Sequence, residues 1–263
     1  MIKIQGQYNL YTDSVTIVKK YGDNKYKVTT HNQLRIAGLE ARNKKPHKAY
    51  EHKLDESVSR ARSTIYELAY CNEWDYFCTF TLNKEKYDRY NLAKFRSDFT
   101  QTIRDLRKKY GVEIAYLLIP ERHKDGAWHM HGFIKGLPEQ ELRDFTLQEK
   151  LPSYIRKKLE NGFSVLEWTT YRRKFGFCDL ELIQDREACS AYVTKYITKE
   201  LLNSVQELNH KTYYCSQGLE RAVEVKRGRY MGKQPLNYSF ENEYVHICWA
   251  RDMDISNILA EIE

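Results

Sequence analysis

The sequence predicts an α+β fold, in which an antiparallel sheet carries helices on one face and leaves the other face free for a ligand. Segments with the two-residue alternation of strands are interleaved with segments of helical period along much of the chain of 263 residues. The turn sequence His-Lys-Asp-Gly at residues 123–126 lies between two β-like runs and predicts a hairpin. Helices mixed with at least one hairpin are typical of an α+β sandwich.

The first fifty residues are expected to stand apart from the main domain. Short β-like runs occupy residues 14–18 and 26–30, and a polar stretch at 41–48 contains a proline. We therefore divide the chain into a basic N-terminal segment, 1–50, and a main domain with a C-terminal elaboration, 51–263.

The main domain begins with four predicted elements. Apolar residues recur at helical spacing from Asp55, and this helix leads into a strand at residues 76–82. A second helix at about 92–110 ends at Gly111, and an apolar strand follows at 114–119.

Four more elements complete the predicted order. A strand at 128–134 follows the hairpin turn and is expected to pair antiparallel with the strand before it. We further expect a helix from 138 to about 148, a strand at 177–183 and a helix from 185 to about 202.

Positive charge is concentrated at the N-terminus. The net charge is +7, but residues 1–50 contain ten Lys or Arg against three Asp or Glu, which leaves 33 of each sign in the remainder. Such a segment is either a basic arm that lies on phosphates or a solvated region that aids solubility.

No part of the sequence suggests a secreted or membrane protein. Apolar runs are too short to span a bilayer, and the N-terminus lacks the layout of a secretory signal. Six cysteines are scattered without a CxxC pair, so we expect reduced, mostly buried thiols. A soluble, cytoplasmic protein with no membrane partner is the expectation.

A candidate metal site lies on the strand at 128–134. His129 and His131 are two residues apart, so period-two geometry points both imidazoles to one face of the sheet. Glu121, at the end of the preceding strand, can reach the same ion, and two histidines with one carboxylate suit a catalytic divalent cation. The oxygen ligand favours Mg²⁺ or Mn²⁺, while imidazoles equally suit zinc, cobalt or nickel. His123 is a competing third ligand, and it and Glu121 also fit ordinary turn residues.

A candidate nucleophile helix carries paired tyrosines. Tyr192, Lys195, Tyr196 and Lys199 have the spacing i, i+3, i+4, i+7 and would form one stripe. A phenolate can attack phosphorus and keep the bond energy in a phosphotyrosine, and a neighbouring ammonium group favours the phenolate. The alternative is an amphipathic helix whose aromatic and basic residues only face solvent or DNA.

Three segments interleave basic and aromatic residues, as sites for single-stranded nucleic acid do. Solvated basic faces would look the same. The segments are residues 154–158, residues 171–174 with Arg172, Arg173 and Lys174, and residues 226–230.

Taken in order, three motifs resemble those of the HUH-type rolling-circle replication initiators. They are Phe-Cys-Thr-Phe-Thr-Leu at 77–82, Glu121 with Trp-His-Met-His-Gly-Phe at 128–133, and Tyr-Val-Thr-Lys-Tyr-Ile-Thr-Lys at 192–199. The resemblance covers roughly residues 55–220 and looks closest to the phage, prophage and plasmid branch with paired tyrosines.

This resemblance implies an RRM-like, ferredoxin-like antiparallel sheet and an enzyme that nicks single-stranded DNA at an origin, presented in a hairpin. The nick would leave a 5′-phosphotyrosyl intermediate and a free 3′-hydroxyl, and the strands could be rejoined. The resemblance also implies a role for each motif residue: the metal would be held by His129, His131 and Glu121, the nucleophiles would be Tyr192 and Tyr196 assisted by Lys195 and Lys199, and Thr79 and Thr81 would help to hold DNA.

The resemblance also bears on partners. No GxxxxGK[ST] phosphate loop occurs in the sequence, so unwinding would need a separate host helicase, besides a DNA polymerase, in the cytoplasm of a bacterial host. Residues 211–219 look like a stretch found downstream in the same branch, to which we assign no chemistry.

Three other functions fit parts of the sequence. A transposase or relaxase would use the same chemistry for mobilisation. A non-catalytic RRM-like module would use its tyrosines and histidines only to stack on nucleic acid. A metal hydrolase for a small substrate would cut without a covalent intermediate.

Overall fold

The chain consists of two compact units. The computed structural model describes residues 2–3, 9–37, 46–207, 211–232, 236–241 and 245–263. One unit combines Met1–Tyr50 with Glu220–Glu263, and the other is Glu51–Leu219. The sequence analysis placed residues 51–263 in one domain, whereas the contacts group the last 44 residues of the chain with the first fifty.

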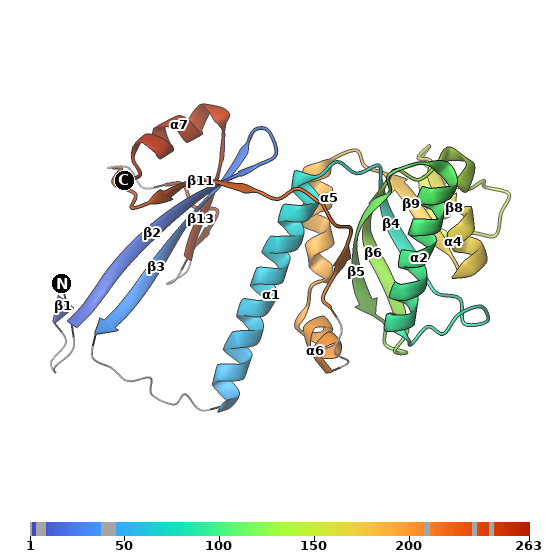
Figure 1. Cartoon of the computed structure of the whole chain (residues 1–263), viewed down its shortest axis with the longest axis horizontal. Coiled ribbons are helices and arrows are strands. Elements are labelled where there is room, and N and C mark those ends of the chain that lie inside the picture. The colour runs from blue at the N-terminus through green and yellow to red at the C-terminus, as the bar shows by residue number, and fades with distance from the viewer. Residues whose placement is uncertain (1, 4–8, 38–45, 208–210, 233–235, 242–244) are drawn as a thin grey trace. The chain divides into compact units, whose positions relative to one another are not determined.

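The first unit is built on an antiparallel sheet (Figure 1). Its central pair, β2 and β3, is a long hairpin, and β13 continues the sheet beyond β3 while β11 lies beside β2. Helix α7 follows β13. The elements are β1 (Ile2–Lys3), β2 (Asn9–Tyr21), β3 (Lys25–Ala37), β11 (Val223–Gly228), β12 (Phe240–Glu241), β13 (Val245–Arg251) and α7 (Asp252–Ala260).

Alternation along the hairpin explains its small core. Val18 and Val28 are opposite each other in the register and are fully buried. They join one apolar cluster with Cys248 of β13 and Ile255 of α7. The β-like runs predicted at 14–18 and 26–30 are confirmed as parts of β2 and β3, whereas phosphate binding by this segment stays a prediction.

The second unit is a seven-stranded sheet in which every pair is antiparallel. The strands, in spatial order, are β10 (Tyr214–Cys215), β5 (Ala115–Arg122), β6 (Trp128–Lys135), β4 (Tyr76–Thr81), β9 (Cys178–Leu182), β8 (Val165–Trp168) and β7 (Leu142–Asp144). The helices are α1 (Pro46–Cys71), α2 (Leu92–Tyr110), α3 (Ser153–Glu160), α4 (Thr169–Lys174), α5 (Arg186–Val193) and α6 (Lys199–Glu207), with 3₁₀ turns η1 (Glu139–Glu141) and η2 (Thr194–Tyr196).

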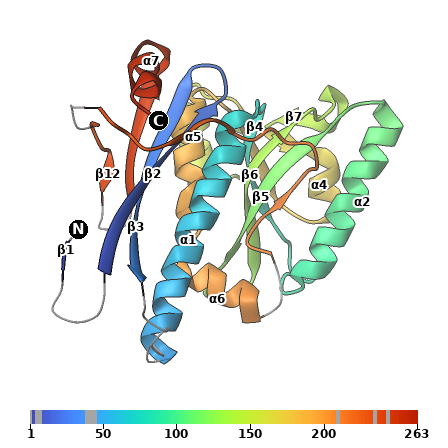
Figure 2. The same ribbon diagram turned by 60° about the vertical axis from the view of Figure 1, so that its left-hand side comes forward.

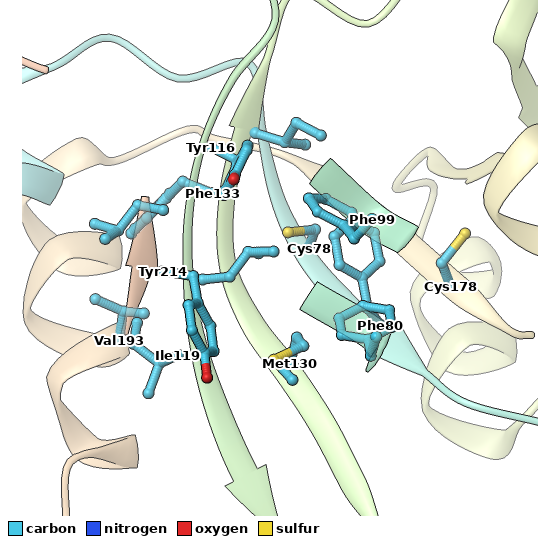
Figure 3. Packing of buried hydrophobic residues seen from close by; sticks show 14 of the residues in the cluster. Cys78, Phe80, Phe99, Tyr116, Ile119, Met130, Phe133, Cys178, Val193 and Tyr214 are labelled. Carbon is cyan, nitrogen blue, oxygen red and sulfur yellow. The ribbon is translucent and has the colours of Figure 1, made fainter. Parts of the chain in front are cut away.

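Helices flank both faces of this sheet, with α2 on one side and α1 and α5 on the other (Figure 2). On the α2 side, Phe80 of β4 packs against Phe99 and stacks on Tyr171 of α4, with ring centroids 5.7 and 4.5 Å apart. On the other side, Val193 of α5 and Ile119 of β5 are buried in the same core (Figure 3). The predicted α+β fold with an antiparallel sheet is confirmed.

Helix α2 illustrates how local sequence sets these elements. The Asn91 side chain accepts a hydrogen bond from the backbone N–H of Lys94 and caps the N-terminus. Gly111 takes the left-handed conformation at the C-terminus, with φ of 67°. The predicted helix at 92–110 is therefore confirmed at both ends.

The helix predicted at 138–148 is wrong. After Pro138 the chain makes only the single 3₁₀ turn η1, and Leu142–Asp144 then extends as β7. The reason is tertiary: Leu142 pairs with Trp168 of β8, and the Phe145 N–H donates to the Val165 carbonyl. Strand pairing at the sheet edge outweighs local helical propensity here.

The continuous helix predicted at 185–202 is also wrong, because the chain breaks at Ile197. The residue has ψ of 96°, outside the helical range, and its carbonyl accepts a hydrogen bond of 2.9 Å from Arg62 Nε. Thr198 then caps α6 by accepting from the Leu201 N–H. Lys199 thus begins a separate helix, and the single stripe predicted for the tyrosines and both lysines does not form.

Two further properties can be stated for the described residues. All six cysteines are free thiols, and four of them are buried. Across the part of the chain that the structure describes, no helix has the length and apolar character needed to cross a membrane.

Close strand packing at Gly132 gives a stability prediction. A Cβ atom at this position would meet the Leu117 carbonyl oxygen at 1.9 Å, so the β5–β6 pair must separate to admit any side chain. We expect Gly132→Ala to lower the free energy of unfolding by about 3 kcal/mol in urea titrations.

The matched control is Gly162→Ala, where nothing lies within 4 Å of the added Cβ but φ is +79°. It should cost only about 1 kcal/mol of backbone strain. Equal losses in the two variants would contradict the proposed close approach.

Candidate active site

The strand register gathers the candidate ligands on one face of the sheet. His129 of β6 lies directly opposite Glu121 of β5 and Thr81 of β4, and His131 lies opposite Thr79. Directly opposed residues of antiparallel strands point to the same face with Cβ atoms about 5 Å apart. The sheet therefore brings five of the predicted residues into one patch.

His131 is held between a carboxylate and a phenol ring. Its Nε2 lies 2.8 Å from Glu121 Oε2, and its ring is stacked on Tyr196 with centroids 4.0 Å apart. The hydrogen bond to His131 lowers the pKa of Glu121 below its usual value, against the opposing effect of burial. Glu121 is thus ionised at neutral pH.

His129 is kept neutral by its surroundings. Burial, reinforced by the nearby His123 and His131, lowers its pKa to about 4. Its Nδ1 lies 3.2 Å from Thr81 Oγ1, and its ring stacks on His123 with centroids 3.7 Å apart. If Nδ1–H donates to the threonine hydroxyl, Nε2 keeps its lone pair, which is the form that binds a metal.

The donor chemistry of this patch fits a divalent cation. The Nε2 and Oε2 atoms of His131 and Glu121 are 2.8 Å apart, close to the separation of about 3 Å between adjacent ligands of an octahedral ion with bonds near 2.1 Å. As the side chains stand, however, no three His, Cys, Asp or Glu groups among the described residues are arranged to hold a metal. The His129 ring, now stacked on His123, would have to turn.

The paired tyrosines reach the same face from α5 and η2. Tyr192 is 49% exposed, and its hydroxyl accepts from the Tyr196 hydroxyl at 3.5 Å. Lys195 Nζ lies 3.5 Å from the centroid of the Tyr192 ring and 4.7 Å from that of Tyr196. One ammonium group therefore serves both phenols.

The two phenols differ in acidity. Burial and the hydrogen bond donated to Tyr192 raise the pKa of Tyr196 far above its usual value. For Tyr192, burial acts upward, but hydrogen bonds from Lys195 and Tyr196 outweigh it and lower the pKa. A negative charge on the pair is thus better tolerated on Tyr192.

A cleft of about 760 Å³ adjoins these groups. Glu121 and His123 line it on the strand side, and Lys195 and Tyr196 line it on the helical side. The side chains that could bind a cation and a nucleophile that could attack therefore face a common space.

Four other predicted residues lie away from this patch. Lys199 opens α6 beyond the break in the helix. Arg172, Arg173 and Lys174 are on α4, whose Tyr171 packs on the opposite face of the sheet. The structure does not bring this basic segment to the histidines.

Two residues of the basic segment are engaged with other groups. Arg172 lies 3.6 Å from a Glu167 carboxylate oxygen, and Lys174 donates to the Thr102 hydroxyl. A role of the segment in holding DNA stays a prediction.

Asp179 was missed by the sequence analysis. It is 1% exposed on β9 and lies opposite Thr79, one strand further across the site face from His131. The Tyr154 hydroxyl donates to Asp179 Oδ1 at 2.8 Å, and burial raises the pKa of Asp179 to about 6. An aspartate between two apolar residues of a strand was the signal that could have found it.

Comparison with known proteins agrees with this arrangement. Residues 75–201 match a family model described as replication-associated protein of the ORF2 type. The matched region contains the histidines, Glu121 and both tyrosines, and the match supports a role in the initiation of replication. No curated protein and no solved structure matches the chain.

The raised pKa of Asp179 predicts a pH dependence of stability. In the unfolded chain the pKa is about 3.9, so between about pH 4 and pH 6 the folded state binds more protons and stability falls as pH rises. Asp179→Asn keeps an oxygen for the Tyr154 hydroxyl but removes the buried charge. We expect it to raise the free energy of unfolding at pH 7 by about 2 kcal/mol over wild type, with little difference at pH 4.

The control is Glu160→Gln, which neutralises an exposed carboxylate on α3. Its urea unfolding should follow the wild type at both pH values. A variant of Asp179 that is less stable than wild type at pH 7 would mean that the ionised carboxylate is stabilising.

Proposed function

We propose that this protein is a replication initiator that nicks single-stranded origin DNA by tyrosine transesterification, in the manner of the HUH-type initiators with paired tyrosines. The observation that carries the proposal is the stacking of Tyr196 on His131, whose Nε2 contacts Glu121. A phenol held against an imidazole–carboxylate pair, above an open cleft, has the groups that phosphoryl transfer to tyrosine needs.

The proposed reaction exchanges one phosphate ester for another. The phenolate oxygen of the tyrosine forms a bond to phosphorus while the P–O3′ bond of the DNA breaks. The phenol proton is released, and O3′ takes up a proton to become the free 3′-hydroxyl. The 5′ side stays attached as a phosphotyrosyl ester, and reversal of the step by another 3′-hydroxyl rejoins the strands.

The proposed cofactor is Mg²⁺ or Mn²⁺, held by His129, His131 and Glu121. Such an ion polarises a phosphoryl oxygen and offsets charge that develops in the transition state. Lys195 supplies a second positive charge beside both phenols. Thr81 contributes by orienting His129, with which it shares a hydrogen bond.

Two tyrosines allow a second transfer without a second enzyme molecule. While one holds the cut strand, the other is near enough, at 3.5 Å between hydroxyls, to attack a newly made junction. The proposed partners are single-stranded DNA at the origin, a separate helicase and a DNA polymerase.

The first test is metal-dependent formation of a covalent adduct. Purified protein is incubated with pooled single-stranded oligonucleotides from its own genomic locus, with Mn²⁺ or with EDTA, and analysed on a denaturing gel. We expect an adduct with Mn²⁺ that disappears in EDTA and falls by about 100-fold or more in His131→Ala, as loss of an electrostatic catalyst does.

The control for general loss of charge is His246→Ala, a histidine of the first unit that lies on β13. It should retain the adduct. Cleavage without an adduct would replace the proposal with metal-dependent hydrolysis, and binding without cleavage would favour a non-catalytic module.

The order of the tyrosines is a separate prediction. Tyr196 contacts His131 and lines the cleft, whereas Tyr192 lies one turn earlier. We therefore expect Tyr196→Phe to abolish the first adduct on a single-site oligonucleotide, and Tyr192→Phe to retain most of it. Peptide mapping of the adduct identifies the modified residue, and modification of Tyr192 in the wild type would reverse the assignment.

A further inference from the structure

A second groove lies on the other side of the sheet from the candidate active site. It has a volume of about 830 Å³ and is bounded by α2 and by the segment at residues 211–217. That segment includes β10, which pairs with β5 at the edge of the sheet. Its Ser216 hydroxyl accepts a hydrogen bond from the Tyr116 N–H, so the wall of the groove is attached to the strand.

One stripe of α2 forms the opposite wall. Arg96, Thr100, Ile103, Arg104 and Arg107 all line the groove. Their spacing of three and four residues places them on one side of the helix. The first and last arginines are eleven residues apart, which spans roughly 16 Å along the helix axis.

The charge of the groove is strongly positive. Arg96, Arg104, Arg107 and Lys211 line it, against the single carboxylate of Glu113. Glu113 is 94% exposed and lies 3.9 Å from Arg107, at the limit of an ion pair. Among the described residues, no carboxylate pairs with Arg96 or Arg104, so both keep their charge for a ligand.

The arginines are also positioned by neighbours. Arg107 donates from Nε to the Ile114 carbonyl at 3.2 Å. The Arg96 guanidinium lies 5.4 Å from the centroid of the Tyr214 ring. The half-buried Tyr213 lines the same groove and supplies a second aromatic ring. Cations along a track with aromatic rings beside it are the features that bind single-stranded nucleic acid.

We propose that this groove binds the sugar–phosphate backbone of the single-stranded DNA that flanks the cleaved phosphodiester. The inference deepens the proposed function and rests on it for the identity of the ligand. Tyr116, at the groove, and Glu121, at the candidate active site, are five residues apart on β5 and face opposite sides of the sheet. That is a separation of roughly 17 Å along the strand, so one strand of DNA passing around the sheet edge reaches both.

The test measures binding of fluorescein-labelled poly(dT) of about 30 nucleotides by anisotropy, in EDTA and over a series of salt concentrations. This probe needs no origin sequence and no cleavage. We expect Arg96→Gln/Arg104→Gln to weaken binding on the order of tenfold and to reduce the slope of log K against log salt by about 1.4, which corresponds to two lost phosphate contacts.

The matched control is Lys108→Gln/Lys150→Gln, which removes the same charge from exposed positions outside the groove. It should change the slope by much less. An equal effect in both variants would show that only net charge matters and would overturn the inference, as would tighter binding to duplex than to single-stranded DNA at this groove.

The readouts separate the two proposals. Loss of poly(dT) affinity in the arginine variant, with no adduct in the wild type, would retain the groove and reject the nicking mechanism. An adduct in the wild type, with unchanged poly(dT) binding in the arginine variant, would do the reverse. Circular dichroism melting of the arginine variant should match that of the wild type, because both side chains are exposed.

Discussion

The antiparallel register of β4, β5 and β6 is the constraint on which the candidate site depends. Because His129 lies opposite both Glu121 and Thr81, its two neighbours across the sheet are an acid and a hydroxyl. A slip of one residue in either pair would turn the opposing side chains to the other face. The absence of a side chain at Gly132 lets β5 approach closely enough to hold that register. Catalytic geometry and strand packing are therefore set by the same backbone hydrogen bonds.

Much of this arrangement was readable in the sequence, because it depends on short-range signals. The alternation of His129 and His131, and the hairpin turn that leads to them, fix a face and a neighbour without knowledge of the rest of the chain. The same holds for α2, whose cap at Asn91 and terminal Gly111 are local. The buried Asp179 could be located only after β9 had been paired with β4, since its neighbours in sequence do not reveal which strand it will face.

The features that the sequence did not reveal come from contacts between distant residues. The break at Ile197 is accompanied by a hydrogen bond from Arg62, 135 residues away, which no helical periodicity could indicate. The short strand β7 exists because β8 lies beside it. Likewise, β13 pairs with β3 along seven residues although more than two hundred residues separate them in sequence. In each case pairing partners that are remote along the chain outweighed the local preference.

The break at Ile197 also limits how the chain can vary in length. The two tyrosines are positioned by the number of residues between the cap of α5 at Asp185 and the carbonyl bound by Arg62. Each residue of an α-helix turns the chain by about 100°, so one inserted residue would carry a phenol roughly a quarter turn away from His131. Substitutions in this segment can preserve the site, whereas insertions and deletions cannot. Among homologous chains, spacing should therefore be conserved here even where identity is not.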